Sequence, residues 1–305
     1  MEKWTVPYSG LEAGPVALGC MRMSSLDTTE AERVIKTSLE AGINVFDHAD
    51  IYGGGEAERV FGRAVPLHGS QRENMIIQSK CGIREGFFDF SEEHILSSVD
   101  AVLQRLGTDY LDVLLLHRPD VLMEPEETGR AFDQLFQSGK VRNVGVSNMN
   151  PGQIRLLQSG MDRPIAVNQM QLSLLHTPMI DAGLQVNMHW DGAVQRDGGT
   201  LEYMREQDMT LQAWSPFQHG MIEGPFIDQP AFPEINKALS DMAEKYNTSK
   251  EAVAAAWILR LPMKAQTVIG SMNTSRIQRT AEAAQITLTR KDWYMLYQAA
   301  GNKLP

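Results

Sequence analysis

Short, nearly continuous apolar runs recur along the chain and alternate with amphipathic segments. Uninterrupted hydrophobicity over a few residues is typical of parallel β-strands that are buried on both faces. Eight runs have this character, and they span residues 15–21, 43–47, 74–80, 112–117, 141–147, 164–170, 209–215 and 265–270.

The segments between these runs repeat apolar residues at the spacing of an amphipathic helix. One helix is expected to begin at Thr29, with Glu32 completing a capping box, and to stop at Gly42. Another is expected to begin at Ser91 and to end at Gly107. The apolar face of each helix needs a surface to cover, and the neighbouring strands provide it.

Eight strands followed by helical material predict a closed (β/α)8 barrel, the TIM-barrel fold, as a single domain over residues 1–305. The rival architecture is an open, doubly wound sheet, which normally carries a GxGxxG turn after its first strand. Here that turn has the sequence GCMRMSS, and the triple glycine at 53–55 lacks the Lys-Ser/Thr of a P-loop. The pattern therefore favours the barrel.

Two segments are longer than ordinary connections in a barrel. Residues 172–200 have mixed composition, and residues 217–233 are rich in Gly, Pro and aromatic residues. We expect both to be long loops, the second one lying over the barrel mouth, because long loops in a compact domain usually carry function.

The composition narrows the possible functions. A formal charge of −10 argues against nucleic acid as a partner, because phosphate binding needs clustered Lys and Arg. Two cysteines cannot form a disulfide framework. No run reaches the roughly 18 apolar residues of a membrane span, and the first residues lack the apolar stretch of a signal peptide. We therefore expect a reduced, cytoplasmic protein without a membrane partner.

Four polar residues of complementary chemistry lie at or just past the ends of three consecutive expected strands. Asp47 ends the second strand, Tyr52 follows it in the loop, Lys80 ends the third strand and His117 ends the fourth. Because active sites of (β/α)8 enzymes lie at the carboxyl ends of the strands, we expect these four residues, called the tetrad below, to share one side of the mouth. Each residue alone is often only a loop hydrogen-bonding group, so the site is indicated by their coincidence.

The tetrad suits general acid catalysis on a carbonyl oxygen. The ordinary pKa of a tyrosine is about 10, and the ammonium of Lys80 is expected to lower the pKa of Tyr52. Asp47 is expected to hold Lys80 in place and keep it charged. His117 is expected to orient the substrate oxygen, while a cofactor supplies the hydride.

A metal-dependent hydrolase is a second possible chemistry. His48 and Asp50, together with His117, are candidate metal ligands. Such a site needs further His or carboxylate ligands at other strand ends, and the sequence places none there. We therefore rank this hypothesis below the reductase and expect no metal.

Two motifs give the chain a resemblance to a known family. The stretch FDHADIYG over residues 46–53 matches the FD-x-A-x-x-YG pattern of the aldo-keto reductases, and Tyr110, Asp112, His117 and Pro119 match their Y-x-D-x-x-x-x-H-x-P pattern. The resemblance extends over essentially the whole chain and is strongest to the bacterial oxidoreductase branch. It implies that the tetrad is the family's Asp-Tyr-Lys-His site for carbonyl reduction.

The resemblance also implies a nicotinamide cofactor, NADPH/NADP, lying across the barrel mouth. The nicotinamide would meet polar strand-end residues and stack on Trp214, and the 2′-phosphate would meet Arg276 at the start of a helix near Thr274. Bidentate recognition of phosphate by arginine favours NADP over NAD. The cofactor residues implied in this way are Met21, Asp47, Ser147, Asn148, Gln169, Trp214, Ser215, Phe217, Gly270, Ser271, Arg276 and Thr280.

The sequence departs from the family pattern at the expected phosphate site. Gly270 stands where a lysine is often found, and Arg279 and Thr280 replace the usual Glu-Asn pair. In the loop after the seventh strand, Phe217 replaces the leucine of an SPL motif. These changes bear on the preference for NADPH over NADH.

The expected substrate is a small carbonyl compound. Only GNKLP follows the last expected helix, so the long tail that narrows the pocket in some relatives is expected to be absent and the pocket to be tolerant. The expected pocket residues are Met23, Phe87, Phe88, Phe90 and Trp190. An alternative function is a regulatory subunit that binds NADP with little turnover, and the intact tetrad argues against it.

Overall fold

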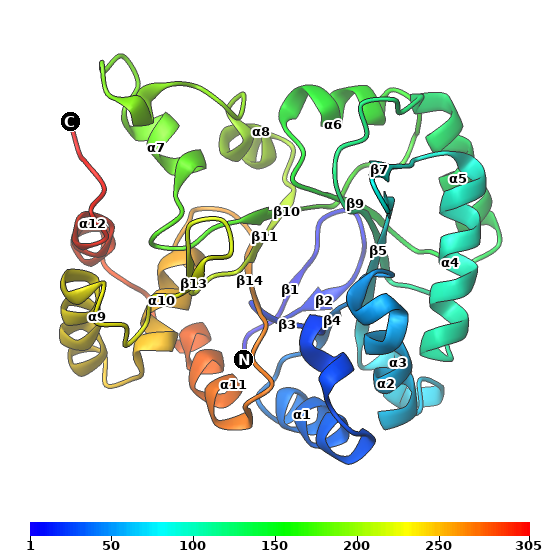
Figure 1. Cartoon of the computed structure of the whole chain (residues 1–305), viewed down its shortest axis with the longest axis horizontal. Helices are drawn as coiled ribbons and strands as arrows, with labels where there is room; N and C mark the ends of the chain where they lie inside the picture. The colour runs from blue at the N-terminus through cyan, green and yellow to red at the C-terminus, as the bar shows by residue number, and fades with distance from the viewer.

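Eight parallel strands close into a barrel in the computed structural model, which describes residues 1–305 (Figure 1). Neighbours in the barrel follow the order of the chain, and the last strand pairs with the first through Val268 and Ala17. Each of the eight apolar runs overlaps one of these strands, so the predicted (β/α)8 fold is confirmed. The strands are β3 (Val16–Gly19), β4 (Val45–Asp47), β5 (Ile76–Cys81), β8 (Val113–Leu116), β9 (Val144–Ser147), β10 (Val167–Gln171), β11 (Thr210–Trp214) and β14 (Ala265–Ile269).

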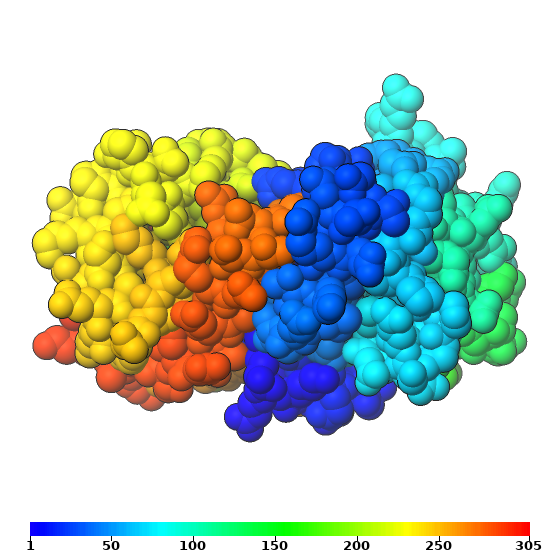
Figure 2. Space-filling model, turned by 90° about the horizontal axis from the view of Figure 1, so that it is seen from below, coloured from blue at the N-terminus to red at the C-terminus, as the bar shows by residue number.

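Helices surround the barrel and cover the apolar outer face of its strands (Figure 1). The first and last parts of the barrel lie side by side, with α1 in blue next to α11 in orange (Figure 2). No helix has the length and hydrophobicity needed to span a membrane. The helices are α1 (Thr28–Glu40), α2 (Glu56–Ala64), α3 (Gly69–Glu73), α4 (Glu92–Leu106), α5 (Pro125–Gln137), α6 (Pro151–Gln158), α7 (Pro178–Leu184), α8 (Thr200–Glu206), α9 (Pro233–Lys245), α10 (Lys250–Leu259), α11 (Thr274–Ala281) and α12 (Arg290–Ala299).

Three short hairpins lie outside the barrel sheet. The hairpin of β1 (Trp4–Thr5) and β2 (Glu12–Ala13) lies at the amino ends of the strands, where Gly14 N donates to Asn44 Oδ1. The other two leave the carboxyl ends: β6 (Ile83–Arg84) with β7 (Phe87–Phe88), and β12 (Gln218–His219) with β13 (Gly224–Pro225). In Figure 2 the dark-blue first residues and a protruding cyan segment lie on opposite sides of the molecule.

The helix ends agree in part with the sequence. Ser91 caps α4 by accepting from His94 N, and Gly107 ends it with φ 69°, as predicted. The capping box predicted at Thr29 is wrong, because α1 begins earlier. Asp27 and Glu30 have the same spacing and each accepts from the other's backbone N–H, so this pair caps the helix in place of Thr29.

The long segment over 172–200 is not the plain loop that we expected. It holds α7 and a 3-10 turn, Asp191–Ala193, before α8 leads into β11. The segment over 217–233 carries the β12–β13 hairpin and lies at the mouth, as predicted.

A buried ionic cluster ties together the amino ends of three strands. Arg72 Nη1 pairs with Asp112 Oδ2 at 2.7 Å, and both side chains are almost completely buried. Arg142 reaches the other oxygen of Asp112 at 3.4 Å. The ring of Tyr110 lies between the two guanidinium groups, 3.8 Å from that of Arg72 and 3.6 Å from that of Arg142.

Candidate active site

The structure brings the tetrad together at the carboxyl ends of the strands. Asp47 is the last residue of β4, and Lys80 lies in β5 beside it. The Lys80 ammonium is fully buried, 2.7 Å from Asp47 Oδ1 and 2.8 Å from Oδ2, and it also donates to the backbone oxygen of His48 at 2.8 Å. The third donation of Lys80 goes to the hydroxyl of Tyr52 at 3.2 Å.

Tyr52 and His117 approach this ion pair from the loops that follow β4 and β8. Tyr52 begins a tight turn, Tyr52–Gly55, in which Gly53 and Gly54 have positive φ and carry the chain back over the strand ends. The ring of His117 meets the ring of Tyr52 edge-on, with centroids 6.0 Å apart. Four residues from three strand ends therefore share one small volume.

The protonation states follow from burial and charge. Burial raises the pKa of Tyr52, and the opposing effect of the Lys80 ammonium does not cancel it. The lowered pKa that we expected for Tyr52 is therefore wrong for this structure, and the phenol keeps its proton at neutral pH. Burial alone would lower the pKa of Lys80, but the carboxylate of Asp47 raises it above its ordinary value, so the ammonium stays charged.

His117 is neutral in this environment. Burial, with help from the charges of Lys80 and Arg118, lowers the pKa of His117 to about 2. Its Nδ1 is buried without a hydrogen-bond partner. A neutral imidazole beside a protonated phenol can orient an oxygen without competing for the phenol's proton.

A single cavity of about 700 Å³ runs from the tetrad across the barrel mouth. Asp47, Tyr52 and His117 line it, whereas Lys80 lies behind Tyr52, out of contact with the cavity. The cavity also contacts every residue that the family resemblance assigned to the cofactor. These are Met21, Asp47, Ser147, Asn148, Gln169, Trp214, Ser215, Phe217, Gly270, Ser271, Arg276 and Thr280.

Three non-glycine residues in the wall of the cavity have left-handed backbone conformations. They are Asn148, with φ 57°, directly after β9, Ser215, with φ 51°, directly after β11, and Ile222, with φ 64°, between β12 and β13. Such conformations cost free energy outside glycine and are enriched at binding sites. Trp214 Nε1 donates to Asn148 Oδ1 at 3.1 Å, which links the loops after β9 and β11 and fixes the indole ring.

The far end of the cavity is positively charged. Helix α11 begins at Thr274, as predicted, and Arg276 lies in its first turn. Arg22, which the sequence did not single out, donates from Nη1 to the backbone oxygen of Gly270 at 2.8 Å. A Cβ at position 270 would lie 2.8 Å from that nitrogen, so the missing side chain makes room for the guanidinium of Arg22.

Arg279 makes a different contact. It pairs with Glu251 at 2.7 Å, and Glu251 itself lines the cavity. The carboxylate of Glu251 is therefore neutralised, and the cations left facing this end of the cavity are Arg22 and Arg276. Spacing could not reveal the role of Arg22, because its partner is 248 residues away.

None of the five expected substrate residues lines the cavity. Met23 and Phe90 are packed in the core, and Phe87 and Phe88 lie on the exposed β6–β7 hairpin. Trp190 lies beneath the ammonium of Lys303, 5.6 Å from its ring centroid, in the segment before α8. The cavity is instead lined by Ile51, Ile83, Arg118 and Ile222, beside the residues already named.

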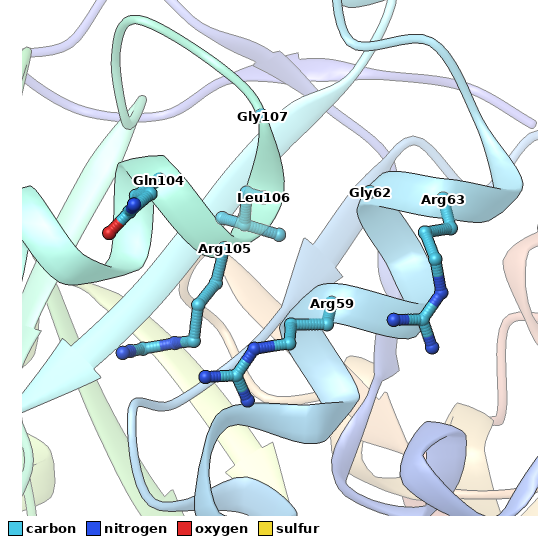
Figure 3. Close-up of a pocket in the computed structure, with 7 residues that line it drawn as sticks. All are labelled: Arg59, Gly62, Arg63, Gln104, Arg105, Leu106 and Gly107. Carbon is cyan, nitrogen blue, oxygen red and sulfur yellow. The ribbon is translucent and has the colours of Figure 1, made fainter.

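A second hollow, of about 440 Å³, lies between α2 and α4 and contains three arginines (Figure 3). Arg63 and Arg59 pair with Glu56 at 2.7 and 3.6 Å, and Arg105 pairs with the buried Glu58 at 2.6 Å. Each of the three arginines already has a carboxylate partner, so this hollow is a weaker anion site than the main cavity.

The proposed metal ligands do not converge. No three His, Cys, Asp or Glu side chains lie together in a geometry that could hold a metal ion. The ring of His48 is buried edge-on against Phe61 with both nitrogens unpartnered, and burial lowers the pKa of His48 to about 3. These residues therefore do not support the hydrolase hypothesis.

Comparison with known proteins indicates the same family that the sequence motifs of the tetrad indicated. The model of the Aldo/keto reductase family matches residues 15–300. The chain is 35% identical to Oxidoreductase YdhF of Escherichia coli (strain K12), over 98% of both chains. It is 36% identical to a 6-dehydroglucose reductase of Agrobacterium fabrum, over 96% of both chains.

Solved structures match in fold. An aldo-keto reductase from Klebsiella pneumoniae in complex with NADPH superposes with a TM-score of 0.78 at 22% identity, covering 99% of this chain and 97% of its own. With the family match over nearly the whole barrel, the chain belongs to the aldo/keto reductase family, oxidoreductases that reduce carbonyl groups with NAD(P)H.

Proposed function

We propose that this protein reduces aldehydes or ketones to alcohols with NADPH and that Tyr52 donates the proton. The observation that carries the proposal is the Tyr52 hydroxyl, held by a buried ammonium at the wall of a cavity whose far end carries two arginines without a carboxylate partner, Arg22 and Arg276. When bound, the nicotinamide cofactor supplies a hydride to the carbonyl carbon. The proton on the Tyr52 oxygen goes to the carbonyl oxygen, which leaves a phenolate beside Lys80.

The other tetrad residues support that transfer. The Lys80 ammonium stabilises the phenolate that remains, and the carboxylate of Asp47 keeps Lys80 charged and in place. The neutral imidazole of His117 contacts the substrate oxygen and directs it toward the hydroxyl of Tyr52. The buried setting strengthens each of these interactions, because little water competes for them.

The residues of the cavity fit a dinucleotide. Gln169 and Asn148 present amide groups beside the fixed ring of Trp214, as a nicotinamide requires. Arg22, Arg276 and the amino end of α11 provide positive potential for phosphate groups. The ring of His117 lines the cavity and makes no side-chain hydrogen bond with the protein, which is consistent with a group that meets a ligand in the working enzyme.

The experiment that tests the activity is NADPH oxidation, followed at 340 nm, against aldehydes, ketones, dicarbonyls and sugar aldehydes. Turnover of at least one class is expected. Stoichiometric binding of NADP with no turnover of any carbonyl would instead support the regulatory subunit.

The cofactor preference is tested by titration with NADPH and NADH, followed through tryptophan fluorescence. Arg276→Gln is expected to weaken the binding of NADPH by about tenfold or more and that of NADH very little, since one charge-assisted hydrogen bond contributes about 1.5–3 kcal/mol.

Arg22→Gln tests which phosphate group of the cofactor lies near Gly270. Weakening of both dinucleotides places the pyrophosphate there, and weakening of NADPH alone places the 2′-phosphate there. Equal wild-type affinities for NADPH and NADH would contradict the preference.

Arg118 points to the kind of substrate. Its half-buried guanidinium lines the cavity beside His117, makes no hydrogen bond or ion pair with the protein, and lies 5.7 Å from the ring centroid of Trp214. Free N–H donors favour a carbonyl compound rich in hydroxyl groups or bearing an acid, and the relative named 6-dehydroglucose reductase makes a sugar aldehyde the first choice. Arg118→Met should raise KM for a sugar aldehyde more than for an apolar aldehyde of similar size.

A further inference from the structure

Four glutamine side chains occupy the centre of the barrel directly below Asp47. They come from four different strands: Gln78 from β5, Gln169 from β10, Gln212 from β11 and Gln266 from β14. None is more than 3% exposed. Burying an amide costs free energy unless its N–H and C=O groups are bonded, so their partners decide what they do.

The amides form one directional network. Nε2 of Gln78 and Nε2 of Gln169 both donate to Asp47 Oδ1, at 2.5 and 3.1 Å, and both donate to Gln212 Oε1, at 2.9 and 3.0 Å. Nε2 of Gln212 donates to Oε1 of Gln78 at 3.1 Å and to Oε1 of Gln266 at 2.8 Å. Nε2 of Gln266 donates to the backbone oxygen of Gly14 at 2.7 Å.

The two ends of the network determine the orientation of every amide in it. A backbone carbonyl and a carboxylate can only accept, so Gln266 must point its NH₂ group at Gly14, and Gln78 and Gln169 must point theirs at Asp47. Turning any amide over would set oxygen against oxygen in at least one contact. The orientation is therefore specified by chemistry and not by packing alone.

This arrangement has two consequences at the cavity. Asp47 Oδ1 receives two amide donors in addition to Lys80, which prevents the carboxylate from turning and holds Lys80 against Tyr52. Both N–H groups of Gln169 are already used, so only its Oε1 is left to meet a ligand in the cavity. A ligand must therefore present a donor to Gln169, as the NH₂ of a primary carboxamide does.

We propose that Gln78, Gln212 and Gln266 are positioning residues for the reaction: they hold Asp47 and fix the orientation of Gln169 through a chain of amides. The proposal rests on the proposed function, because it concerns the same tetrad. A buried network of this kind is seldom the most stable way to fill a core, since apolar side chains of similar volume often do as well. Its retention at this place is explained by what it does for Asp47.

The test is a series of Gln→Met variants, which keep the volume and remove the amide. The loss of kcat is expected to become smaller as the residue lies further from Asp47 along the network, counted in hydrogen-bond steps. It should be about 10- to 100-fold for Gln78→Met, where a bond to a charged group is lost, about tenfold for Gln212→Met and about threefold for Gln266→Met.

Asn143→Leu is the matched control. Asn143 is a buried amide at the amino end of the barrel, directly before β9, that donates to the backbone oxygen of Asp112 at 2.9 Å and forms no hydrogen bond with Gly14 or with the glutamines. This variant should lower Tm as the glutamine variants do but leave kcat at the wild-type value. If Gln78→Met does not fold, Gln212→Met reports on the same two donors.

A pH profile separates positioning from general destabilisation. In the alcohol-oxidation direction Tyr52 must be deprotonated, so activity rises with pH. Without an amide donor the charge of Asp47 is less well compensated and disfavours the phenolate. The rising limb should then move to higher pH in Gln78→Met and not in Asn143→Leu.

The proposal would be overturned if the loss of kcat in each variant correlated with its decrease in Tm and not with its distance from Asp47 along the network. An unchanged pH profile in Gln78→Met would also overturn it. The failure of the proposed function looks different. In that case the wild-type protein shows no turnover, or Tyr52→Phe keeps it, whatever the glutamine variants do.

Discussion

The two ends of the barrel each carry a carboxylate, a cationic side chain and a tyrosine, and the tyrosine is held differently at each end. At the amino end, Asp112 is paired with Arg72, and Tyr110 is held by its ring between two guanidinium groups. At the carboxyl end, Asp47 is paired with Lys80, and Tyr52 is held by its hydroxyl.

The difference lies in which atom of the tyrosine is engaged. The guanidinium groups stack on the faces of Tyr110 and stabilise the fold through its ring. The ammonium of Lys80 bonds the oxygen of Tyr52, where a proton can leave, and this oxygen lies beside a cavity. The composition of a cluster does not reveal its role; the atom in contact and the presence of open space beside it do.

The strongest test of this comparison removes one hydroxyl from each end. Tyr52→Phe is expected to lower kcat by about 10²- to 10⁴-fold, the usual contribution of a positioned general acid, and to leave NADPH affinity almost unchanged. Tyr110→Phe keeps the stacked ring and should retain wild-type kcat. Steady-state kinetics and fluorescence titration of the two variants measure this, and turnover by Tyr52→Phe within about threefold of wild type would break the comparison.

The second test removes one cation from each end. Arg72→Met leaves the buried Asp112 with only the longer, 3.4 Å contact to Arg142. This loss is expected to cost at most about 3–5 kcal/mol of unfolding free energy without changing the kcat of the folded protein. Lys80→Met should lower stability and kcat together. Urea unfolding gives the stability of both variants, and a loss of kcat in Arg72→Met would show that the amino-end cluster also serves the reaction.

The third test concerns an acid that has no counterpart at the amino end. Burial, reinforced by the nearby carboxylate of Glu58, raises the pKa of Asp50 to about 7, and its Oδ1 has no partner. Because the folded-state pKa lies above the unfolded one, the protonated acid is favoured in the fold, and its contribution to stability is lost as pH rises from about 4 to about 7. Asp50→Asn cannot ionise and avoids that loss.

The advantage of Asp50→Asn over wild type should therefore grow by about 3 kcal/mol between pH 5 and pH 8. Urea unfolding at the two pH values measures it. An advantage of equal size at both pH values would mean that Asp50 is ionised in the fold throughout this range.

Much of this molecule could be predicted from local patterns. Near-continuous apolar runs identify parallel strands, and polar residues at the carboxyl ends of those strands must meet, so the barrel and the grouping of Asp47, Tyr52, Lys80 and His117 follow from position alone. The net direction of the Tyr52 pKa could not be predicted, because it depends on how completely the phenol is buried.

Contacts between distant segments were not accessible to the same reasoning. Phe87 and Phe88 precede an expected helix and could face the cavity or the solvent, since a hairpin's direction is set by its packing and not by its spacing. Arg22 and Gly270 meet only because the last strand closes against the first. Gln212 and Gln266 each lie inside a mostly apolar strand, and nothing in their neighbours indicates an inward polar partner.

The closure of the network against Gly14 bears on when the protein becomes active during its synthesis. Every tetrad residue has been made once the chain reaches residue 117, but of the four amides only Gln78 has been made by then, and the other three arrive with residues 169, 212 and 266. A nascent chain that has passed His117 therefore carries all its proton-transfer residues and still has no working site. We expect reduction to begin only when β14 pairs with β3 and completes the barrel, so that an unfinished chain consumes no NADPH.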